Sequence, residues 1–231
     1  MRLTQQNSNY EISYKAIMIA VGILGALLPG IVLLITFSIG KCSSVQYSLS
    51  HYYYTIAGDV FVGLLTAIAL FLIAYKGPEF QDNLFTNIAG LLALLIAFFP
   101  STNNEDVKCF LFELSNNKFV TTVHFTAATF FLLILSGISL FLFTKTKGKK
   151  TREKELRNKF YYVCGAMIFL SIIVLALFYN IDSLTPYVES YHLTFWLEWM
   201  ALFSFGLSWL IKGGFILRDK GTINTVNHLR N

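Results

Sequence analysis

Six long apolar runs constrain the fold of this chain more than any other feature of its sequence. They cover about residues 16–39, 55–75, 84–99, 119–143, 160–179 and 191–211. A transmembrane helix needs about 20 apolar residues, because each residue adds about 1.5 Å and the hydrocarbon layer is about 30 Å thick. The runs are continuous, whereas the strands of a membrane barrel alternate apolar and polar residues. The sequence therefore predicts an all-α integral membrane bundle of six transmembrane helices, forming a single domain over residues 1–231.

The composition agrees with lipid as the main solvent. Hydrophobic residues make up 55% of the chain and charged residues 13%, whereas a typical soluble domain has about 25% charged residues. The net charge of +5 does not indicate a nucleic-acid-binding protein, because the basic residues lie in short segments between the apolar runs. This distribution is typical of membrane insertion, and the expected partners are membrane lipids.

The positions of Lys and Arg predict the orientation of the bundle. Of the 18 basic residues, 15 fall on one side of the runs: Arg2, Lys15, Lys76, the eight between Lys145 and Lys159, Lys212, Arg218, Lys220 and Arg230. The other side holds Lys41, Lys108 and Lys118. Because basic loops stay in the cytoplasm, we expect both termini and the basic loop at residues 144–159 to be cytoplasmic, in the inner membrane. The loop is expected to act as an anchor, with binding of anionic lipid head groups as the alternative.

The three cysteines are placed differently with respect to the membrane. Cys42 and Cys109 fall in the two outer loops, so both face the oxidising side, where a disulfide between them can form. Free thiols are the alternative. Cys164 lies near the inner end of the fifth run, without an obvious partner.

A stripe of small residues predicts close helix contact in the third run. Ala89, Ala93 and Ala97 recur every four residues beside Gly90. Small residues at this spacing let two helix backbones approach each other within a membrane.

Three ionisable residues inside the predicted spans mark a candidate site. Asp59 and Glu198 are the acids within a run, and His124 is the histidine inside a run, since His192 lies at the outer edge of the last one. Each is costly in hydrocarbon, so each is expected to face the bundle interior and to seek a partner. Counted from the outer end of its run, each lies on the order of 6–11 Å below the outer surface. This shared depth predicts one outward-facing cluster.

Polar or small residues repeat at helical spacing beside each of these three side chains. Thr55 and Gly63 are in line with Asp59, and Thr194 is in line with Glu198. Three such stripes facing one another predict a polar pocket that opens outward. The predicted ligand-binding residues, with the four rim side chains last, are Asp59, His124, Glu198, Thr55, Thr194, His51, Ser48, Ser50 and His192.

The chemistry of the cluster has several interpretations. Asp59, His124 and Glu198 are the candidate catalytic residues and the candidate ligands of a divalent metal such as zinc, since two carboxylates with a histidine suit such an ion. They can equally relay protons or lock helices together. We expect the pocket to bind a lipid or small amphiphile. One alternative is a membrane-embedded, possibly metal-dependent hydrolase of outer-leaflet lipids, and another is a cluster that is only structural or proton-relaying.

Two segments resemble a group of uncharacterised bacterial multi-helix membrane proteins. They are Ser48-Leu-Ser-His-Tyr-Tyr-Tyr-Thr followed by Asp59-Val-Phe-Val-Gly-Leu-Leu, and Glu198 with Phe205-Gly-Leu-Ser-Trp-Leu-Ile-Lys-Gly. The likeness covers nearly the whole chain and implies no particular activity. The polar segment before the second run is also similar to one in DRAM-like six-helix proteins. Ser, Asp and His residues in separate helices resemble the ceramidase-like superfamily of membrane hydrolases, whose members have seven helices and a paired-histidine motif on the last.

Overall fold

The chain folds into a bundle of long helices, as the apolar runs predict. The computed structural model describes residues 2–101, 109, 111, 117–146 and 151–217. The long helices are α1 (Arg2–Ser38), α2 (Gly58–Ala74), α3 (Phe80–Phe98), α4 (Lys118–Gly137), α5 (Arg152–Asn180) and α7 (Leu193–Lys212). A π-helical turn, η2 (Ile138–Leu142), continues α4. The short elements are the 3-10 helices η1 (Leu49–Tyr54) and η3 (Asp182–Leu184), and α6 (Thr185–Ser190).

Within the described residues, five helices are long and apolar enough to cross a membrane. They are Tyr14–Ser38 within α1, α3, Lys118–Leu142 formed by α4 with η2, α5 and α7. The apolar α2 is shorter, with 17 residues. Large apolar side chains such as Leu34, Phe98 and Phe141 are more than half exposed on the surface of the bundle. Such a surface is unfavourable in water, so the chain is a multi-pass membrane protein.

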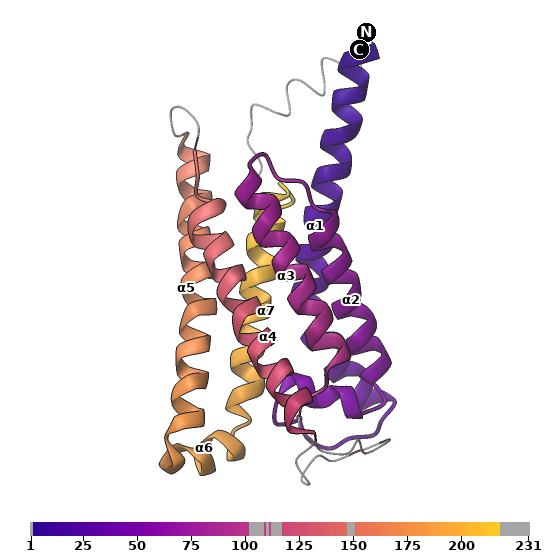
Figure 1. Ribbon diagram of the computed structural model, residues 1–231, viewed down its shortest axis with the longest axis vertical. Coiled ribbons are helices and arrows are strands. Elements are labelled where there is room, and N and C mark those ends of the chain that lie inside the picture. Colours follow the sequence, from indigo (N-terminus) through magenta and orange to yellow (C-terminus); the bar gives the residue numbers. More distant parts are fainter. Residues whose placement is uncertain (1, 102–108, 110, 112–116, 147–150, 218–231) are drawn as a thin grey trace.

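The long helices run alternately up and down and close into a ring (Figure 1). Each of α1 to α5 packs against the next along the chain, α5 packs against α7, and α7 returns to α1. The start of α1, the α2–α3 turn, the start of α5 and the end of α7 share one end of the bundle. The elements η1 and α6 lie at the opposite end, which we call the outer end.

The ring closes through a close contact between α1 and α7. A Cβ atom on Gly206 would lie 2.5 Å from the carbonyl oxygen of Gly22 and 2.6 Å from the backbone nitrogen of Ala26. Side chains larger than hydrogen would therefore push the two backbones apart. Glycine at this position allows the closest approach of the first and last helices.

The predicted stripe on α3 is confirmed as a packing surface. Ala89, Ala93 and Ala97 are buried. A Cβ atom on Gly90 would lie 2.7 Å from the carbonyl oxygen of Ala69, so α2 and α3 are in close backbone contact there. The stripe thus joins the two helices as the spacing predicts.

The basic segment is shorter as a loop than the predicted range of 144–159. Residues 147–150 lie outside the described residues, and α5 begins already at Arg152. The hydroxyl of Thr151 accepts a hydrogen bond from the Lys154 backbone nitrogen, and Glu153 and Glu155 lie in the first turn. An N-cap and acids near a helix N-terminus both stabilise the helix, which explains the early start.

Candidate functional site

Glu198 is the intramembrane acid that the structure places inside the bundle. It lies on α7 five residues after the helix begins, on the order of 8 Å of helix rise from the outer end. Its Oε2 atom accepts a hydrogen bond of 2.6 Å from the backbone nitrogen of Leu49 in η1. The backbone nitrogen of Phe195 also donates to the carbonyl oxygen of Tyr47, at 3.1 Å. These two bonds attach the segment around η1 to the first turns of α7.

His124 holds the same segment from the opposite side. This side chain on α4 is 2% exposed. Its Nδ1 atom lies 2.7 Å from the carbonyl oxygen of Phe99, and its Nε2 atom lies 2.9 Å from the hydroxyl oxygen of Ser50. Because a carbonyl only accepts, Nδ1 carries a hydrogen, and in a singly protonated ring Nε2 then accepts from the Ser50 hydroxyl. His124 and Glu198 therefore meet η1 rather than each other.

Asp59 does not join them, which corrects the prediction of a single cluster. The helix α2 begins at Gly58, three residues later than the predicted run, so Asp59 lies in its first turn with an exposed side chain. An acid at that position is stabilised by the positive end of the helix dipole without any partner. Among the described residues, no three His, Cys, Asp or Glu side chains are grouped so that they could hold a metal ion. The candidate zinc ligands are thus not brought together.

Other predicted ligand-binding residues make local contacts. The hydroxyl of Ser48 lies 2.6 Å from His51 Nδ1, and both side chains are buried. Thr55 donates to the carbonyl oxygen of Tyr52 and accepts from the backbone nitrogen of Ala57, which shapes the turn into α2. His192 is the N-cap residue of α7 and adopts a left-handed conformation, with φ +49°.

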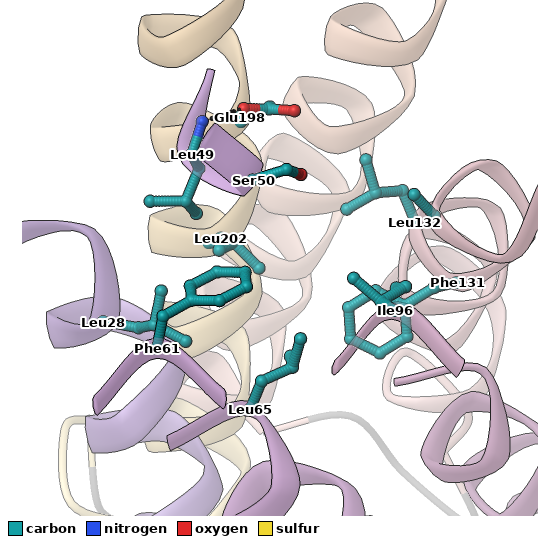
Figure 2. Close-up of a pocket in the computed structure, with 11 residues that line it drawn as sticks. Leu28, Leu49, Ser50, Phe61, Leu65, Ile96, Phe131, Leu132, Glu198 and Leu202 are labelled. Carbon is teal, nitrogen blue, oxygen red and sulfur yellow. Dashed lines mark hydrogen bonds between the residues drawn. The ribbon is translucent and has the colours of Figure 1, made fainter. Parts of the chain in front are cut away.

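A cavity of about 60 Å³ lies beside η1 in the middle of the bundle. Its lining residues are Leu28, Leu49, Ser50, Phe61, Leu65, Ile96, Ala128, Phe131, Leu132, Glu198 and Leu202. Figure 2 shows Glu198 and Ser50 at one end of this cavity, with Phe61 and Leu65 of α2 further along it. The cavity is polar at its outer end and apolar towards the centre of the membrane.

A larger cavity of about 190 Å³ lies on the other side of Glu198, between α4, α5 and α7. Its lining residues are Phe125, Ala128, Thr129, Leu132, Ile172, Leu175, Ala176, Tyr179, Thr194 and Glu198. Towards the inner end α4 and α5 are in close contact, since Ser136 donates to the carbonyl oxygen of Gly165 at 2.8 Å. Large side chains replace these small ones towards the outer end, and the helices leave a cavity between them. Of the predicted ligand-binding residues, Glu198 and Thr194 line it, and Glu198 and Ser50 line the smaller one.

The outer end of the bundle is cross-linked over η1. A disulfide joins Cys42 to Cys109, whose Cα atoms are 5.9 Å apart. The Tyr54 hydroxyl donates a hydrogen bond of 2.5 Å to the carbonyl oxygen of Ser101, and the Leu111 backbone nitrogen donates to the carbonyl oxygen of Tyr54 at 3.0 Å. A carbonyl oxygen only accepts, so the Tyr54 hydroxyl is the donor, and burial raises the pKa of this hydroxyl to about 12. The segment that contacts Glu198 and His124 is therefore firmly held.

Two contacts of the site were not predicted from the sequence. One is the backbone nitrogen of Leu49, which serves as the partner of Glu198. The other is the pair formed by Phe125 and Tyr179, whose rings lie 5.9 Å apart across the outer ends of α4 and α5. A signal for the second was present, because both aromatic residues lie at the outer ends of apolar runs.

Comparisons with protein-family models, with curated proteins and with solved structures find no match to this chain.

Proposed function

We propose that this protein binds a lipid or small amphiphile in the 190 Å³ cavity beside Glu198. The observation that carries the proposal is the position of this carboxyl group, which lies inside a membrane bundle and lines two cavities that are otherwise largely apolar. An ionisable group at membrane depth is costly and typically marks a functional site. An apolar pocket with a few polar groups is the usual form of a site for a small molecule.

The size of the cavity suits one part of an amphiphile. A buried cavity of about 150 Å³ is known to hold a molecule of the size of benzene. A cavity of about 190 Å³ therefore takes a head group or a short chain segment. Phe125 and Tyr179 line it and are 42% and 56% exposed at the surface of the bundle. We propose that the rest of the ligand passes between these two side chains into the lipid.

The proposed topology has six spans and both termini in the cytoplasm of the inner membrane. The 17 residues of α2 rise about 25 Å, which nearly crosses the hydrocarbon layer. Basic segments that are distant in sequence lie together at one end, since Lys145 forms an ion pair of 2.8 Å with Glu79 and Arg157 donates to the carbonyl oxygen of Leu217 at 3.2 Å. The positive-inside rule supports a cytoplasmic location for that end.

Filling the cavity is expected to weaken amphiphile binding about tenfold. Ala176 and Ala166 are both exposed alanines of α5, but only Ala176 lines the cavity. The protein in lipid nanodiscs would be photolabelled with a hexadecanol that carries a diazirine near its hydroxyl end. We expect Ala176→Phe to reduce labelling of α4 and α7 about tenfold, since overpacking costs about 1–3 kcal/mol and about 1.4 kcal/mol is a factor of ten.

The matched control is Ala166→Phe, which adds the same side chain to the lipid-facing surface of the same helix. It should label like the wild type. Equal labelling of both variants, or labelling spread evenly over all the helices, would show that the cavity does not hold the amphiphile. In that case the polar contacts of Glu198 and His124 are structural.

Hydrolysis of an ester is a second candidate, favoured by the pair of Ser50 and His124. A nucleophile, a base within hydrogen-bond reach and a group that orients the base form a recurrent catalytic arrangement. Here Ser50 lines the smaller cavity, and the Phe99 carbonyl oxygen orients His124. In the proposed step the Ser50 oxygen bonds to the ester carbon, His124 Nε2 takes the hydroxyl proton and passes it to the departing alcohol, and water then releases the acyl group.

A fluorophosphonate probe distinguishes this candidate from simple binding. A reactive serine displaces fluoride and retains the phosphonyl group, so the intact mass rises by one adduct. We expect an adduct at Ser50 that is lost in Ser50→Ala and kept in Ser48→Ala, because the Ser48 hydroxyl contacts His51 instead. An unchanged mass of the folded wild type would exclude serine-based hydrolysis, while amphiphile binding would stand.

A further inference from the structure

We infer that the 190 Å³ cavity selects an amphiphile whose head group donates hydrogen bonds and carries no negative charge, such as an amine or a hydroxyl. This inference rests on the proposed function of the same site. It follows from the charges that line the cavity, from its unused hydrogen-bonding groups and from the positions of the basic residues.

The charge of the lining disfavours anionic head groups. The described residues that line the two cavities include Glu198 and no Lys, Arg or His. On entering the cavity, a carboxylate or phosphate would lose its hydration and find no cationic partner. It would also lie beside the carboxyl group of Glu198. The cost of an unpaired charge in a low-dielectric site is large.

The basic side chains of α4 and α7 lie too far along these helices to compensate. Lys212 follows Glu198 on α7 by 14 residues, which is about 21 Å of helix rise, and lies towards the opposite end of the bundle. Lys118 precedes Phe125 on α4 by seven residues, about 10 Å of rise, and is exposed at the outer end. An anionic head group near Glu198 is separated from both.

The hydrogen-bonding groups that remain in the cavity favour a donor. Among the hydrogen bonds of the described residues, none involves the hydroxyl of Thr194, which is 1% exposed and lines the cavity. Thr194 and Glu198 are four residues apart on α7 and so share one face of the helix. Glu198 accepts from the Leu49 nitrogen through Oε2, which leaves Oε1 as an acceptor for a ligand.

Of the two other polar side chains of the lining, Thr129 is already engaged and Tyr179 is 56% exposed at the surface of the bundle. Thr129 donates its hydroxyl hydrogen to the carbonyl oxygen of Phe125 at 2.8 Å, as threonines in helices commonly do. The carboxyl oxygen of Glu198 is an acceptor in an apolar cavity, and the Thr194 hydroxyl can accept or donate. An amine or hydroxyl donates to both groups, whereas an ionised acid can only accept from Thr194 and brings no donor to Glu198.

Four competitors with one chain and different head groups test the inference. Hexadecylamine, hexadecanol, palmitic acid and hexadecyl phosphate would compete with the diazirine hexadecanol in nanodiscs at neutral pH. We expect the amine and the alcohol to compete at least about tenfold better than the acid and the phosphate, since hydrogen bonds to a charged group contribute about 1.5–3 kcal/mol, and about 1.4 kcal/mol is a factor of ten.

Dipalmitoylglycerol tests the source of the ligand, because it presents a hydroxyl on a two-chain lipid. Competition equal to that of hexadecanol assigns a membrane lipid as the ligand, and weaker competition assigns a free amphiphile.

Variants of the two acceptors locate the selectivity. Glu198→Gln should remove most of the preference for the amine over the acid, and Thr194→Val should weaken binding of the alcohol. Asp59→Asn, which neutralises an exposed acid that lines neither cavity, should preserve the preference. Equal competition by all four head groups, with labelling still reduced in Ala176→Phe, would overturn the inference and leave the proposed function intact. Loss of selectivity in Asp59→Asn but not in Glu198→Gln would also overturn it.

Discussion

Replacement of Gly206 by alanine is expected to lower the free energy of unfolding by about 1–3 kcal/mol, the usual cost of forcing an extra methyl group into a packed interface. The added Cβ would lie 2.5 Å from the Gly22 carbonyl oxygen and 2.6 Å from the Ala26 nitrogen. Both are backbone atoms, so no side-chain rotation relieves the clash. The two helices must separate, and this contact closes the ring between the first and last helices of the bundle.

Gly63→Ala provides the matched control for this prediction. Gly63 lies within α2, and a Cβ atom there would meet nothing within 4 Å. Alanine is the better helix former by up to about 1 kcal/mol, so this variant should be as stable as the wild type or slightly more stable. Unfolding in detergent, followed by circular dichroism, measures both variants. Equal stability of Gly206→Ala and Gly63→Ala would mean that α1 and α7 are not in backbone contact.

The helices could be predicted from the sequence because their signal is one-dimensional. A run of apolar residues near the length of a membrane crossing is sufficient, and each predicted run corresponds to a helix of the structure. The predicted ends were less accurate. The predicted run at 55–75 included Thr55. In the structure the hydroxyl of Thr55 stabilises a turn before the helix, and α2 begins at Gly58.

The site was only partly predictable, because depth in the membrane does not define direction around a helix. Glu198 and His124 share a depth, and both indeed contact the segment that contains Leu49 and Ser50. Asp59 also shared that depth but is exposed, so a polar stripe on α2 did not imply that it faced the others. The partner of Glu198 is a backbone N–H group, which every residue except proline possesses. No pattern of side chains could have identified it.

The buried position of η1 was hidden for a related reason. Residues Ser48 to Thr55 read as an interfacial segment, because they combine serines, a histidine and three tyrosines. In the structure His51 and Tyr52 are buried, and hydrogen bonds to α4 and α7 satisfy the polar groups at Leu49 and Ser50. A polar segment can enter a membrane bundle when its backbone and side chains find partners there.

A reporter that distinguishes the two sides of the membrane should locate both termini in the cytoplasm. The number of spans determines the result, because an even number returns the C-terminus to the side of the N-terminus. The helix that decides between five and six spans is α2, with 17 residues. We expect fusions at the N-terminus, after Lys76 and after Asn231 to be cytoplasmic, each with an all-or-none difference in reporter activity.

Insertions at Asn104 and Lys149, in connections that lie outside the described residues, complete the test. The first is expected to be external and the second cytoplasmic, because Lys149 belongs to the segment richest in basic residues. If the termini were on opposite sides, α2 would not cross the membrane, and Cys42 and Cys109 would lie on opposite sides of it, where no disulfide could join them. If the termini were together but external, the helix count would stand and the orientation would be reversed, so that the cavity beside Glu198 would face the inner leaflet.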